Sequence, residues 1–450
     1  MNDTICAIST ALGVGAISII KISGNEAIEI VDKLFSENIK EAKSHTIHYG
    51  YIKDKEEIID EVLVTIMRAP KTFTREDVVE INCHGGIATT NKVLELLLIN
   101  GCRMAEPGEF TKRAFLNGRI DLMEAEAVMD LINGKTEEAR RIAIQELNGK
   151  GSKLISELRE ELINIISNIE VNIDYPEYQD IYEVTLKDVK EKVQYFSDKL
   201  KKIVNEYENG RILKEGINTV IVGKPNVGKS SILNKLLNDN KAIVTDIPGT
   251  TRDIVEGSIS FNGILLNIID TAGIRETDDV VEKIGVEKSL SKIKEADLVL
   301  IILNNNEELT KEDLDIIEKT SDKPSIIVIN KNDLNSKIDL NELKGRDIVW
   351  TNTVTDEGID SLKEKISEMF KLEEIKQSDY NFITNTRQIS KIKECINKLN
   401  DVKEALNNDI ALDIIEIDLR DIWNILGEII GESYSEELLD ELFSKFCVGK

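Results

Sequence analysis

The sequence is poor in the residues that build disulfide frameworks, metal clusters and membrane spans. Its five cysteines are odd in number, widely spaced and without a Cys-x-x-Cys pair, which argues against disulfides or a zinc site and favours reduced thiols. Three histidines, His45, His48 and His84, are too few and wrongly spaced for a metal site. No apolar run approaches ~20 residues, and the start, MNDTICAIST, lacks the features of a signal peptide. We therefore expect a cytoplasmic protein without a membrane span.

Positive charge is also scarce. The 57 lysines and arginines against 83 aspartates and glutamates give a formal net charge of −26. Such a chain repels nucleic acid in general, so a nucleic-acid partner would need a local basic patch or a second protein. Long proline, glycine or serine tracts are missing as well, and the composition is that of a globular protein. At 450 residues the chain exceeds one ordinary core, and we expect two or three domains.

Four segments differ in their pattern of apolar residues. Residues 1–118 mix strand-like apolar runs with helical stretches, and residues 119–213 show helical spacing. Residues 214–375 alternate strands and helices regularly, which is typical of a doubly wound parallel sheet. Residues 376–450 are helical again. The simplest interpretation is an α/β domain inserted into a helical domain, so the two helical parts should pack together.

The stretch GKPNVGKS, residues 223–230, matches the phosphate-binding pattern GxxxxGK[ST]. An apolar strand precedes it and a helix follows, so backbone N–H groups can surround phosphates at the positive end of the helix. Lys229 is expected to reach the β- and γ-phosphates, and the Ser230 hydroxyl to bind Mg²⁺. The predicted nucleotide contacts in this stretch are Asn226, Val227, Gly228, Lys229, Ser230 and Ser231.

Three companion motifs follow in order and predict that the nucleotide is GTP. Asp270 opens Asp-Thr-Ala-Gly at the end of an apolar strand, where it can hold the Mg²⁺ shell. Asp333 ends Asn-Lys-Asn-Asp and can accept two hydrogen bonds from guanine, whereas adenine would leave the carboxylate unsatisfied. Thr251 is the expected second hydroxyl on Mg²⁺. The remaining predicted contacts are Thr245, Asp246, Ile247, Pro248, Gly249, Thr250, Thr251, Asp270, Thr271, Ala272, Gly273, Asn330, Lys331 and Asp333.

The position after Asp-Thr-Ala-Gly departs from many Ras-type GTPases, which place there a glutamine that orients the attacking water. Here it is Ile274, which cannot do so. Either another polar group orients the water, or hydrolysis is slow. Arg252 and Arg275 are candidates for an arginine finger, with solvated surface arginines as the alternative interpretation.

The motifs GKPNVGKS, IPGTTRD, DTAGIR, VEKIG and the terminal FCVGK together resemble the tRNA-modification GTPase family MnmE (TrmE), over the whole chain and in the same order. The resemblance implies a folate-binding-like α/β N-terminal domain, a discontinuous helical domain and an inserted Ras-like G domain. It implies a potassium-dependent GTP hydrolase that takes part in forming a 5-(carboxymethyl)aminomethyl-type modification at the wobble uridine of certain tRNAs. It also implies a homodimer, a flavin-dependent partner MnmG in a heterotetramer, and a one-carbon unit from 5-formyl- or methylene-tetrahydrofolate.

The resemblance also assigns a catalytic residue and a cation site. In the family a potassium ion takes the place of an arginine finger, and a cation there offsets the charge that develops on the phosphates. The family's catalytic acid falls on Glu282, which would orient the water in place of Ile274. Without the resemblance, Glu282 reads as a solvated helix carboxylate. The positions matching the potassium site are Asn226, Thr245, Ile247 and Thr250.

One motif of the family is altered at the guanine end. The family usually carries Ser-Ala-Lys or Ser-Ala-Arg near the last strand, and the aligned residues here are Asn352-Thr353-Val354. Backbone groups can still contact the base, but we expect less support from side chains.

By the resemblance, the folate contacts fall on Lys21, Glu80, Arg119 and Lys450. A carboxylate can pair with the amino-pyrimidine edge of a pterin, and basic groups can hold the glutamate tail. Lys21 replaces the more usual arginine, which keeps the charge but loses the bidentate fork. From the residues alone, Lys21 and Glu80 could equally be the polar face of a half-exposed sheet.

Two further features stay open. Apolar neighbours of Cys447 suggest that the terminal FCVGK docks on the protein, and its thiol is interpreted either as chemically active or as a packed or redox-neutral group. A basic cluster could contact tRNA phosphates in a salt-dependent way, or form a solvated helix face. Its members are Arg103, Lys112, Arg113 and Arg119.

Two rival functions remain. A GTP-gated binding module, such as a ribosome-assembly switch, would carry out no modification chemistry. A stand-alone folate transferase with GTP only as a regulator would modify tRNA without a partner. Folate affinity separates the assembly switch from the modification enzyme, because a switch has no use for a one-carbon carrier.

Overall fold

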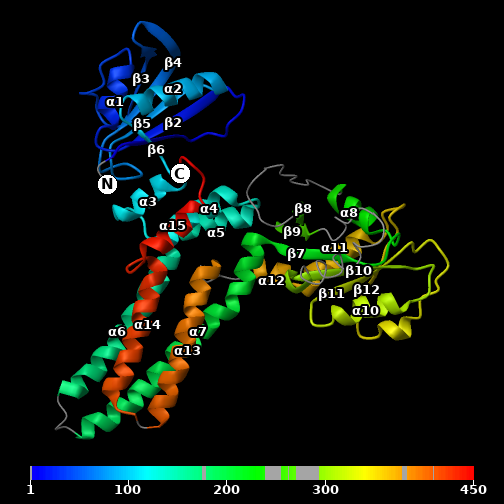
Figure 1. The fold of residues 1–450 in the computed structure, drawn as a ribbon. Coiled ribbons are helices and arrows are strands. Elements are labelled where there is room, and N and C mark those ends of the chain that lie inside the picture. The colour runs from blue at the N-terminus through cyan, green and yellow to red at the C-terminus, as the bar shows by residue number, and fades with distance from the viewer. Residues whose placement is uncertain are drawn as a thin grey trace, which may run out of the picture. The chain divides into compact units, whose positions relative to one another are not determined.

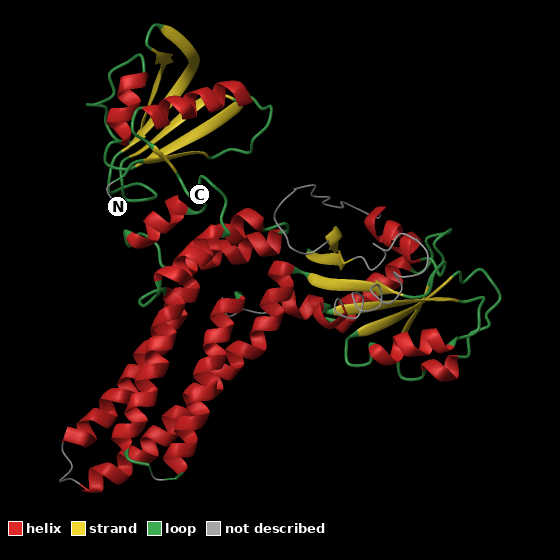
Figure 2. Ribbon diagram, viewed as in Figure 1, coloured by secondary structure: helices red, strands yellow, loops and turns green. Residues whose placement is uncertain are grey.

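The computed structural model describes residues 3–174, 179–238, 255–261, 263–269, 293–377, 383–408 and 410–450 (Figures 1 and 2). No helix among these residues is long and apolar enough to cross a membrane. The chain divides into two compact units. Unit 1 comprises Met1–Met129, Glu146–Phe196 and Glu394–Lys450, and unit 2 comprises Asp130–Gln145 and Ser197–Lys393. The domain boundaries predicted at residues 118, 213 and 375 stay predictions.

Unit 1 begins with a six-stranded sheet in the order β3-β4-β5-β2-β1-β6, with helices α1 and α2 on one face (Figure 1). Ile20, Ile22 and Ile81 point into the core beneath these helices. Because side chains alternate along a strand, Lys21 and Glu80 lie on the opposite face. The elements are β1 (Ile5–Ile8), β2 (Ile17–Ser23), α1 (Ala27–Leu34), β3 (Thr46–Asp54), β4 (Glu57–Met67), β5 (Val78–His84), α2 (Ile87–Ile99) and β6 (Arg103–Met104).

Helices from both ends of the chain pack together in unit 1, as the sequence predicts. Helix α6 runs along α14 (Figure 1), and the Arg159 guanidinium on α6 lies 3.9 Å from the ring centroid of Trp423 on α14. The predicted apolar stripe of α14 is buried from Leu412 to Leu426. The helices outside the two sheets, some of which extend into unit 2, are α3 (Glu109–Leu116), α4 (Leu122–Asn133), α5 (Glu137–Leu147), α6 (Lys150–Asp174), α7 (Gln179–Glu215), α13 (Thr386–Asn407), α14 (Leu412–Ile430) and α15 (Glu436–Ser444).

Unit 2 contains the second six-stranded sheet, ordered β12-β11-β10-β7-β9-β8. Helices α8 and α11 cover one face and α10 the other, so the doubly wound fold is confirmed (Figure 2). The elements are β7 (Ile217–Val222), α8 (Lys229–Asn238), β8 (Val255–Phe261), β9 (Ile264–Ile269), β10 (Leu298–Asn304), α10 (Lys311–Lys319), β11 (Ser325–Asn330), the 3₁₀ helix η1 (Leu340–Leu343), β12 (Asp347–Trp350), α11 (Ile359–Met369) and α12 (Leu372–Gln377).

One strand of this sheet was not predicted. β8 pairs antiparallel with β9, whereas the other neighbours are parallel. Only two residues join β8 to β9, and Gly263 has φ of 75°, a conformation that suits the short turn of a hairpin. The parallel strands matter most for function, because their carboxyl ends bring the loops after β7 and β11 to one edge of the sheet.

Candidate functional site

The phosphate loop, residues 223–228, connects β7 to α8 and has the backbone that its glycines permit. Gly223 and Gly228 have φ of 147° and 105°, and Asn226 also has a positive φ of 63°. A Cβ at Gly228 would lie 2.1 Å from Nδ2 of Asn330. Only glycine fits there, because Asn330 at the end of β11 packs directly against this backbone.

Lys229 and the two serines that follow it occupy the first turn of α8. The Lys229 ammonium donates hydrogen bonds to the carbonyl oxygens of Gly223 at 2.6 Å and Lys224 at 2.8 Å. Ser230 and Ser231 are exposed at this helix end. The first turn therefore presents a cation, hydroxyls and backbone N–H groups together, which suits the binding of phosphates.

The guanine loop, residues 330–333, holds the phosphate loop in place. Asn330 is buried, and its Nδ2 donates to the carbonyl oxygen of Val227 at 3.0 Å. The Lys331 ammonium donates to the carbonyl oxygen of Asn226 at 3.2 Å. Asp333 is exposed at the end of this loop. The structure thus brings the predicted phosphate-binding and base-binding residues to one edge of the sheet.

The altered segment Asn352-Thr353-Val354 forms a turn that is held by its own hydrogen bonds. The Asn352 side-chain oxygen accepts a hydrogen bond from the Val354 amide at 2.9 Å, and the Asn352 amide donates to the Glu357 carbonyl at 2.9 Å. Thr351, just before it, is buried and accepts a hydrogen bond from the Asn332 amide at 3.1 Å. The backbone just before this segment is therefore hydrogen-bonded to the guanine loop. The Asn352 side chain instead stabilises the turn of its own segment.

Much of the predicted nucleotide site lies outside the described residues. This applies to the predicted catalytic residue Glu282, to Ile274, and to both candidate arginine fingers, Arg252 and Arg275. The predicted nucleotide and cation contacts outside the described residues are Thr245, Asp246, Ile247, Pro248, Gly249, Thr250, Thr251, Asp270, Thr271, Ala272 and Gly273.

A second group of predicted residues meets in unit 1 on the face of the first sheet that α1 and α2 leave uncovered. Lys21 on β2 lies directly opposite Glu80 on β5. The Lys21 ammonium lies 5.6 Å from the ring centroid of Phe73 and 5.4 Å from that of Phe110, and the Arg119 guanidinium lies 4.9 Å from the Phe73 centroid. Two cations and a carboxylate thus gather beside a pair of aromatic rings.

The electrostatics place Lys450, the last residue, in the same group. Burial lowers the pKa of Lys21, the negative charge of Glu80 raises it, and the positive charge of Lys450 lowers it. The net result is a pKa below the usual lysine value. The two lysines therefore repel each other, and an anionic ligand between them would relieve that repulsion.

The terminal segment docks on the N-terminal part of unit 1, as predicted. The amides of Gly108 and Phe110 donate to the carbonyl oxygens of Cys447 at 3.3 Å and Lys450 at 3.2 Å. Phe446 is buried in a cluster with Phe443 and Phe115. Cys447 is exposed rather than packed, and its chemical role stays a prediction. Backbone hydrogen bonds, rather than burial of the sulfur, fix this segment.

The predicted basic cluster is divided, because Arg113 is buried whereas Arg103 and Arg119 are exposed. Arg113 is buried, and carboxylates from three segments of unit 1 pair with it, as a buried cation requires. Only Arg119 of the four is exposed without a carboxylate partner among these ion pairs. The pairs are Arg113 with Glu76 at 3.1 Å, Asp3 at 3.0 Å and Glu109 at 3.0 Å, Arg103 with Asp3 at 2.7 Å and with Glu109, and Lys112 with Asp440.

Glu109 shows what this network does. Burial acts to raise the pKa of Glu109, but hydrogen bonds from Arg103, from the Glu106 amide and from Arg113 outweigh burial and leave that pKa below its usual value. The resulting contribution to stability is present above the usual carboxyl pKa and is lost as the pH falls through the lowered value. The network thus serves the fold of unit 1 rather than a ligand.

Phe73 and Phe110 were not found from the sequence. Each is an isolated aromatic residue, and no spacing pattern in the sequence links either of them to Lys21. Phe73 lies in the connection before β5 and Phe110 at the start of α3. Only the tertiary fold brings them to the same lysine, where they pack with Ile5 and Ala7 of β1.

Comparison with known proteins covers the whole chain. Residues 4–119 match the family model described as the GTP-binding protein TrmE N-terminus, and residues 122–447 match that of the MnmE helical domain. The tRNA modification GTPase MnmE of Listeria welshimeri is 52% identical over 454 residues, covering 100% of this chain and 99% of the relative. The proteins of that name from Geobacillus thermodenitrificans and Bacillus subtilis are 50% and 48% identical, each over 458 residues, covering 100% of this chain and 99% and 100% of the relatives.

Among solved structures, the G domain of the T. maritima FeoB iron transporter is 31% identical to the matched part. It covers 34% of this chain and 98% of its own, with a TM-score of 0.26.

Proposed function

The chain belongs to the MnmE family of tRNA modification GTPases, and we propose that its potassium-dependent GTP hydrolysis drives formation of a 5-(carboxymethyl)aminomethyl-type group at the wobble uridine of certain tRNAs. A tetrahydrofolate supplies the one-carbon unit, and a flavoprotein partner, MnmG, takes part. The chain acts in the cytoplasm as a homodimer, joined by the partner into a heterotetramer. The observation that carries this proposal is the meeting of Lys21, Glu80 and Arg119 beside two aromatic rings in a chain that also has a GTP site.

For GTP, the roles follow from where the residues lie. Lys229 binds the β- and γ-phosphates, and Asp333 accepts two hydrogen bonds from guanine. The exposed Ser230 hydroxyl on the first turn of α8 fits a Mg²⁺ ligand, with Thr251 as the second. Bound Mg²⁺ and potassium supply positive charge that offsets the charge developing on the phosphates. Asn226, exposed on the phosphate loop, offers its side-chain oxygen to potassium.

The remaining contacts of the GTP site are assigned by the family resemblance. The potassium ligands beside Asn226 are Thr245, Ile247 and Thr250. Glu282 orients the attacking water, the task that Ile274 cannot perform. Val227, Gly228 and Ser231 complete the contacts of the phosphate loop, and Asn330 and Lys331 those of the guanine loop.

For tetrahydrofolate, the second group of residues offers complementary chemistry. Glu80 pairs with the amino-pyrimidine edge of the pterin, and the cations Lys21, Arg119 and Lys450 hold the carboxylates of the glutamate tail. The rings of Phe73 and Phe110 give the site apolar walls. The exposed Cys447 lies three residues before Lys450, whose carbonyl oxygen accepts a hydrogen bond from the Phe110 amide, so we place its thiol near this site.

Motion of the G domain can reach the helices through α7. Arg211 near the end of α7 makes two hydrogen bonds to the Asp297 carboxylate, at 2.7 and 3.3 Å. Asp297 directly precedes β10 and also accepts a hydrogen bond from the Asn218 amide on β7 at 2.9 Å. A shift of the sheet on hydrolysis would therefore be passed to the long helix that leaves the G domain.

Lys21→Met is expected to weaken binding of 5-formyltetrahydrofolate about tenfold to a hundredfold, because a charge-assisted hydrogen bond is lost. Wild-type affinity should fall as the pH rises through the lowered pKa of Lys21, since only the protonated lysine attracts the anion. The methionine variant should lack this pH dependence. Isothermal titration calorimetry over a pH series measures both effects.

Two control variants sharpen this experiment. Lys21→Arg keeps the charge to higher pH and adds a bidentate fork, so it should bind at least as tightly as the wild type. Lys43→Met removes an exposed lysine away from the site and should change nothing. A wild-type protein that does not bind tetrahydrofolate would contradict the proposed function and favour a GTP-gated assembly switch.

A further inference from the structure

Lys224, the second residue of the phosphate loop, is tied to the helix that follows β10. We propose that Lys224 is a positioning residue for GTP hydrolysis: its ion pair with buried Asp313 fixes the loop carbonyls that hold Lys229. The inference requires GTP hydrolysis, and it is independent of the folate and potassium proposals.

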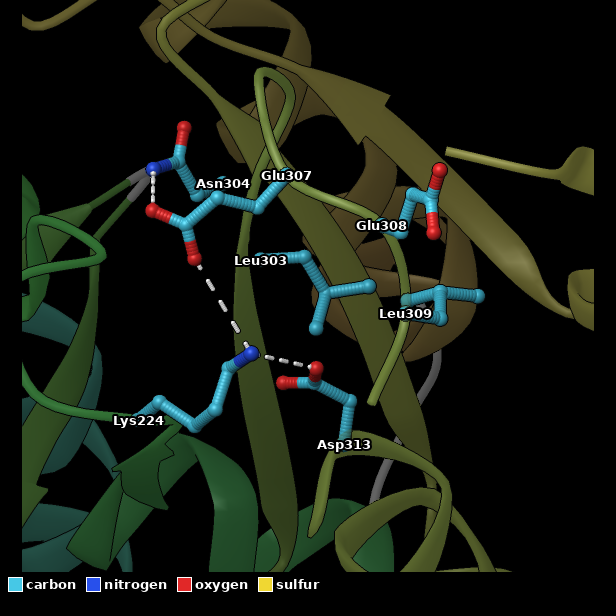
Figure 3. Close-up of a pocket in the computed structure, with 7 residues that line it drawn as sticks. All are labelled: Lys224, Leu303, Asn304, Glu307, Glu308, Leu309 and Asp313. Carbon is cyan, nitrogen blue, oxygen red and sulfur yellow. Dashed lines mark hydrogen bonds and ion pairs between the residues drawn. The ribbon is translucent and has the colours of Figure 1, made fainter. Parts of the chain in front are cut away.

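The Lys224 side chain leaves the phosphate loop and enters a small pocket at the N-terminal end of α10 (Figure 3). Its ammonium lies 2.7 Å from the Asp313 carboxylate, 3.2 Å from the Thr310 hydroxyl and 3.9 Å from the Glu307 carboxylate. The Asp313 side chain is 3% exposed and that of Lys224 is 15% exposed. This is a sheltered ion pair, unlike the exposed pairs that contribute little.

The buried Asp313 carboxylate depends on the Lys224 ammonium for charge compensation. One carboxylate oxygen accepts hydrogen bonds from the Thr310 amide at 2.9 Å and the Thr310 hydroxyl at 2.8 Å, and the same oxygen faces Lys224. The other oxygen is buried and has no hydrogen-bond partner among the described residues. A buried carboxylate that loses its cation is left uncompensated, so the pair strongly favours one position for the Lys224 side chain.

The main chain of Lys224 holds the side chain of Lys229, the lysine that binds the phosphates. Its carbonyl oxygen accepts a hydrogen bond from the Lys229 ammonium at 2.8 Å, next to the 2.6 Å bond to Gly223. One residue is therefore anchored by its side chain and presents its carbonyl group to the ammonium that binds the phosphates. Releasing the side chain would let this carbonyl move, and the Lys229 ammonium would lose a fixed position.

The anchoring connection between β10 and α10 also supports the guanine loop. The Asn305 amide donates to the Asn330 carbonyl at 3.0 Å, and its side-chain amide donates to the Leu334 carbonyl at 2.8 Å. The pair of Lys224 and Asp313 thus joins the phosphate loop to a segment that holds the base-binding loop. Both ends of the nucleotide would be placed against one rigid support.

Lys224→Met and Asp313→Asn each remove the charge pair with little change in size. Each is expected to raise the KM for GTP about tenfold, with a smaller loss in kcat, because phosphate binding is weakened before chemistry. The double variant should be no worse than the more impaired single variant, since both remove one interaction. Lys224→Arg should restore turnover to within about twofold of the wild type, because its guanidinium can still bind Asp313. Lys319→Met, which breaks the exposed pair with Asp315 on α10, serves as control.

Steady-state GTP turnover and melting temperature are measured for every variant. An unchanged KM in Lys224→Met would overturn the proposal, as would effects of the two single variants that multiply in the double variant. Failure of Lys224→Arg to restore activity would also count against it. If Lys224→Met does not fold, the KM for GTP of Asp313→Asn tests the proposal alone. An unaltered KM in that variant overturns the proposal.

Discussion

Asp333→Asn is expected to weaken GTP binding by about a hundredfold or more and to let xanthosine triphosphate bind in its place. The substitution removes a carboxylate that accepts two hydrogen bonds from guanine, and the asparagine amide would face those donors. Xanthine carries a carbonyl group where guanine carries an amino group, so an amide donor matches it. Asp333 is exposed at the end of the guanine loop, and the substitution leaves the buried Asn330 contacts in place.

Titration with fluorescent guanine and xanthine nucleotides measures this reversal of preference. Asp322→Asn, at an exposed position before β11, is the matched control and should bind GTP as the wild type does. A variant at Asp333 that still prefers GTP would show that this carboxylate does not contact the base.

Replacing potassium by sodium at equal ionic strength is expected to slow GTP turnover about tenfold or more. Glu282→Ala should reduce kcat about a hundredfold or more in potassium, because it removes the group that orients the attacking water. Both expectations follow from the family resemblance and from Ile274, which leaves the usual glutamine position without a polar group. Turnover is measured by phosphate release in matched chloride salts.

Glu295→Ala is a suitable control, because Glu295 is exposed and lies before β10, away from the phosphate loop in the chain. It should turn over GTP at the wild-type rate in both salts. Equal rates in potassium and sodium, together with an active Glu282→Ala variant, would contradict the cation-assisted mechanism.

The architecture of the G domain could be predicted because its signals are local. Strand β7, the glycines of the phosphate loop and α8 follow one another within about twenty residues, and each has its own sequence signature. The strands expected around Val220, Ile268, Leu300, Val328 and Val349 are all present. Strand β8 could not be predicted in the same way, because its sequence, VEGSISF, lacks the apolar run of the parallel strands.

The group around Lys21 and Glu80 could be predicted from the sequence only in part. Alternation in β2 and β5 places Lys21 and Glu80 on one face, but it cannot tell a binding face from a solvated one. Phe73, Phe110 and the chain end reach Lys21 only through contacts between segments distant in the sequence. Arg113 makes the opposite point, because this member of the predicted basic cluster is buried and pairs with Asp3, Glu76 and Glu109.

The position of the phosphate loop deep inside the chain also has a physical explanation. The second sheet lies between α7 and α13 in the chain, and α6 and α14, one helix further out on either side, pack together in unit 1. An inserted domain is connected to its host at both ends, so we expect a change in the nucleotide site to act on both helical parts. A GTPase appended at one terminus would have a single connection.

The most direct test measures the modified wobble uridine formed on an unmodified tRNA transcript, by nucleoside mass spectrometry. The complete mixture contains the chain, its flavoprotein partner, an amine donor, methylene-tetrahydrofolate, GTP and potassium, and each component is omitted in turn. Our account predicts the modified nucleoside in the complete mixture and its loss when GTP or tetrahydrofolate is omitted. Formation of the same product at an undiminished level without GTP, or without tetrahydrofolate, would contradict it.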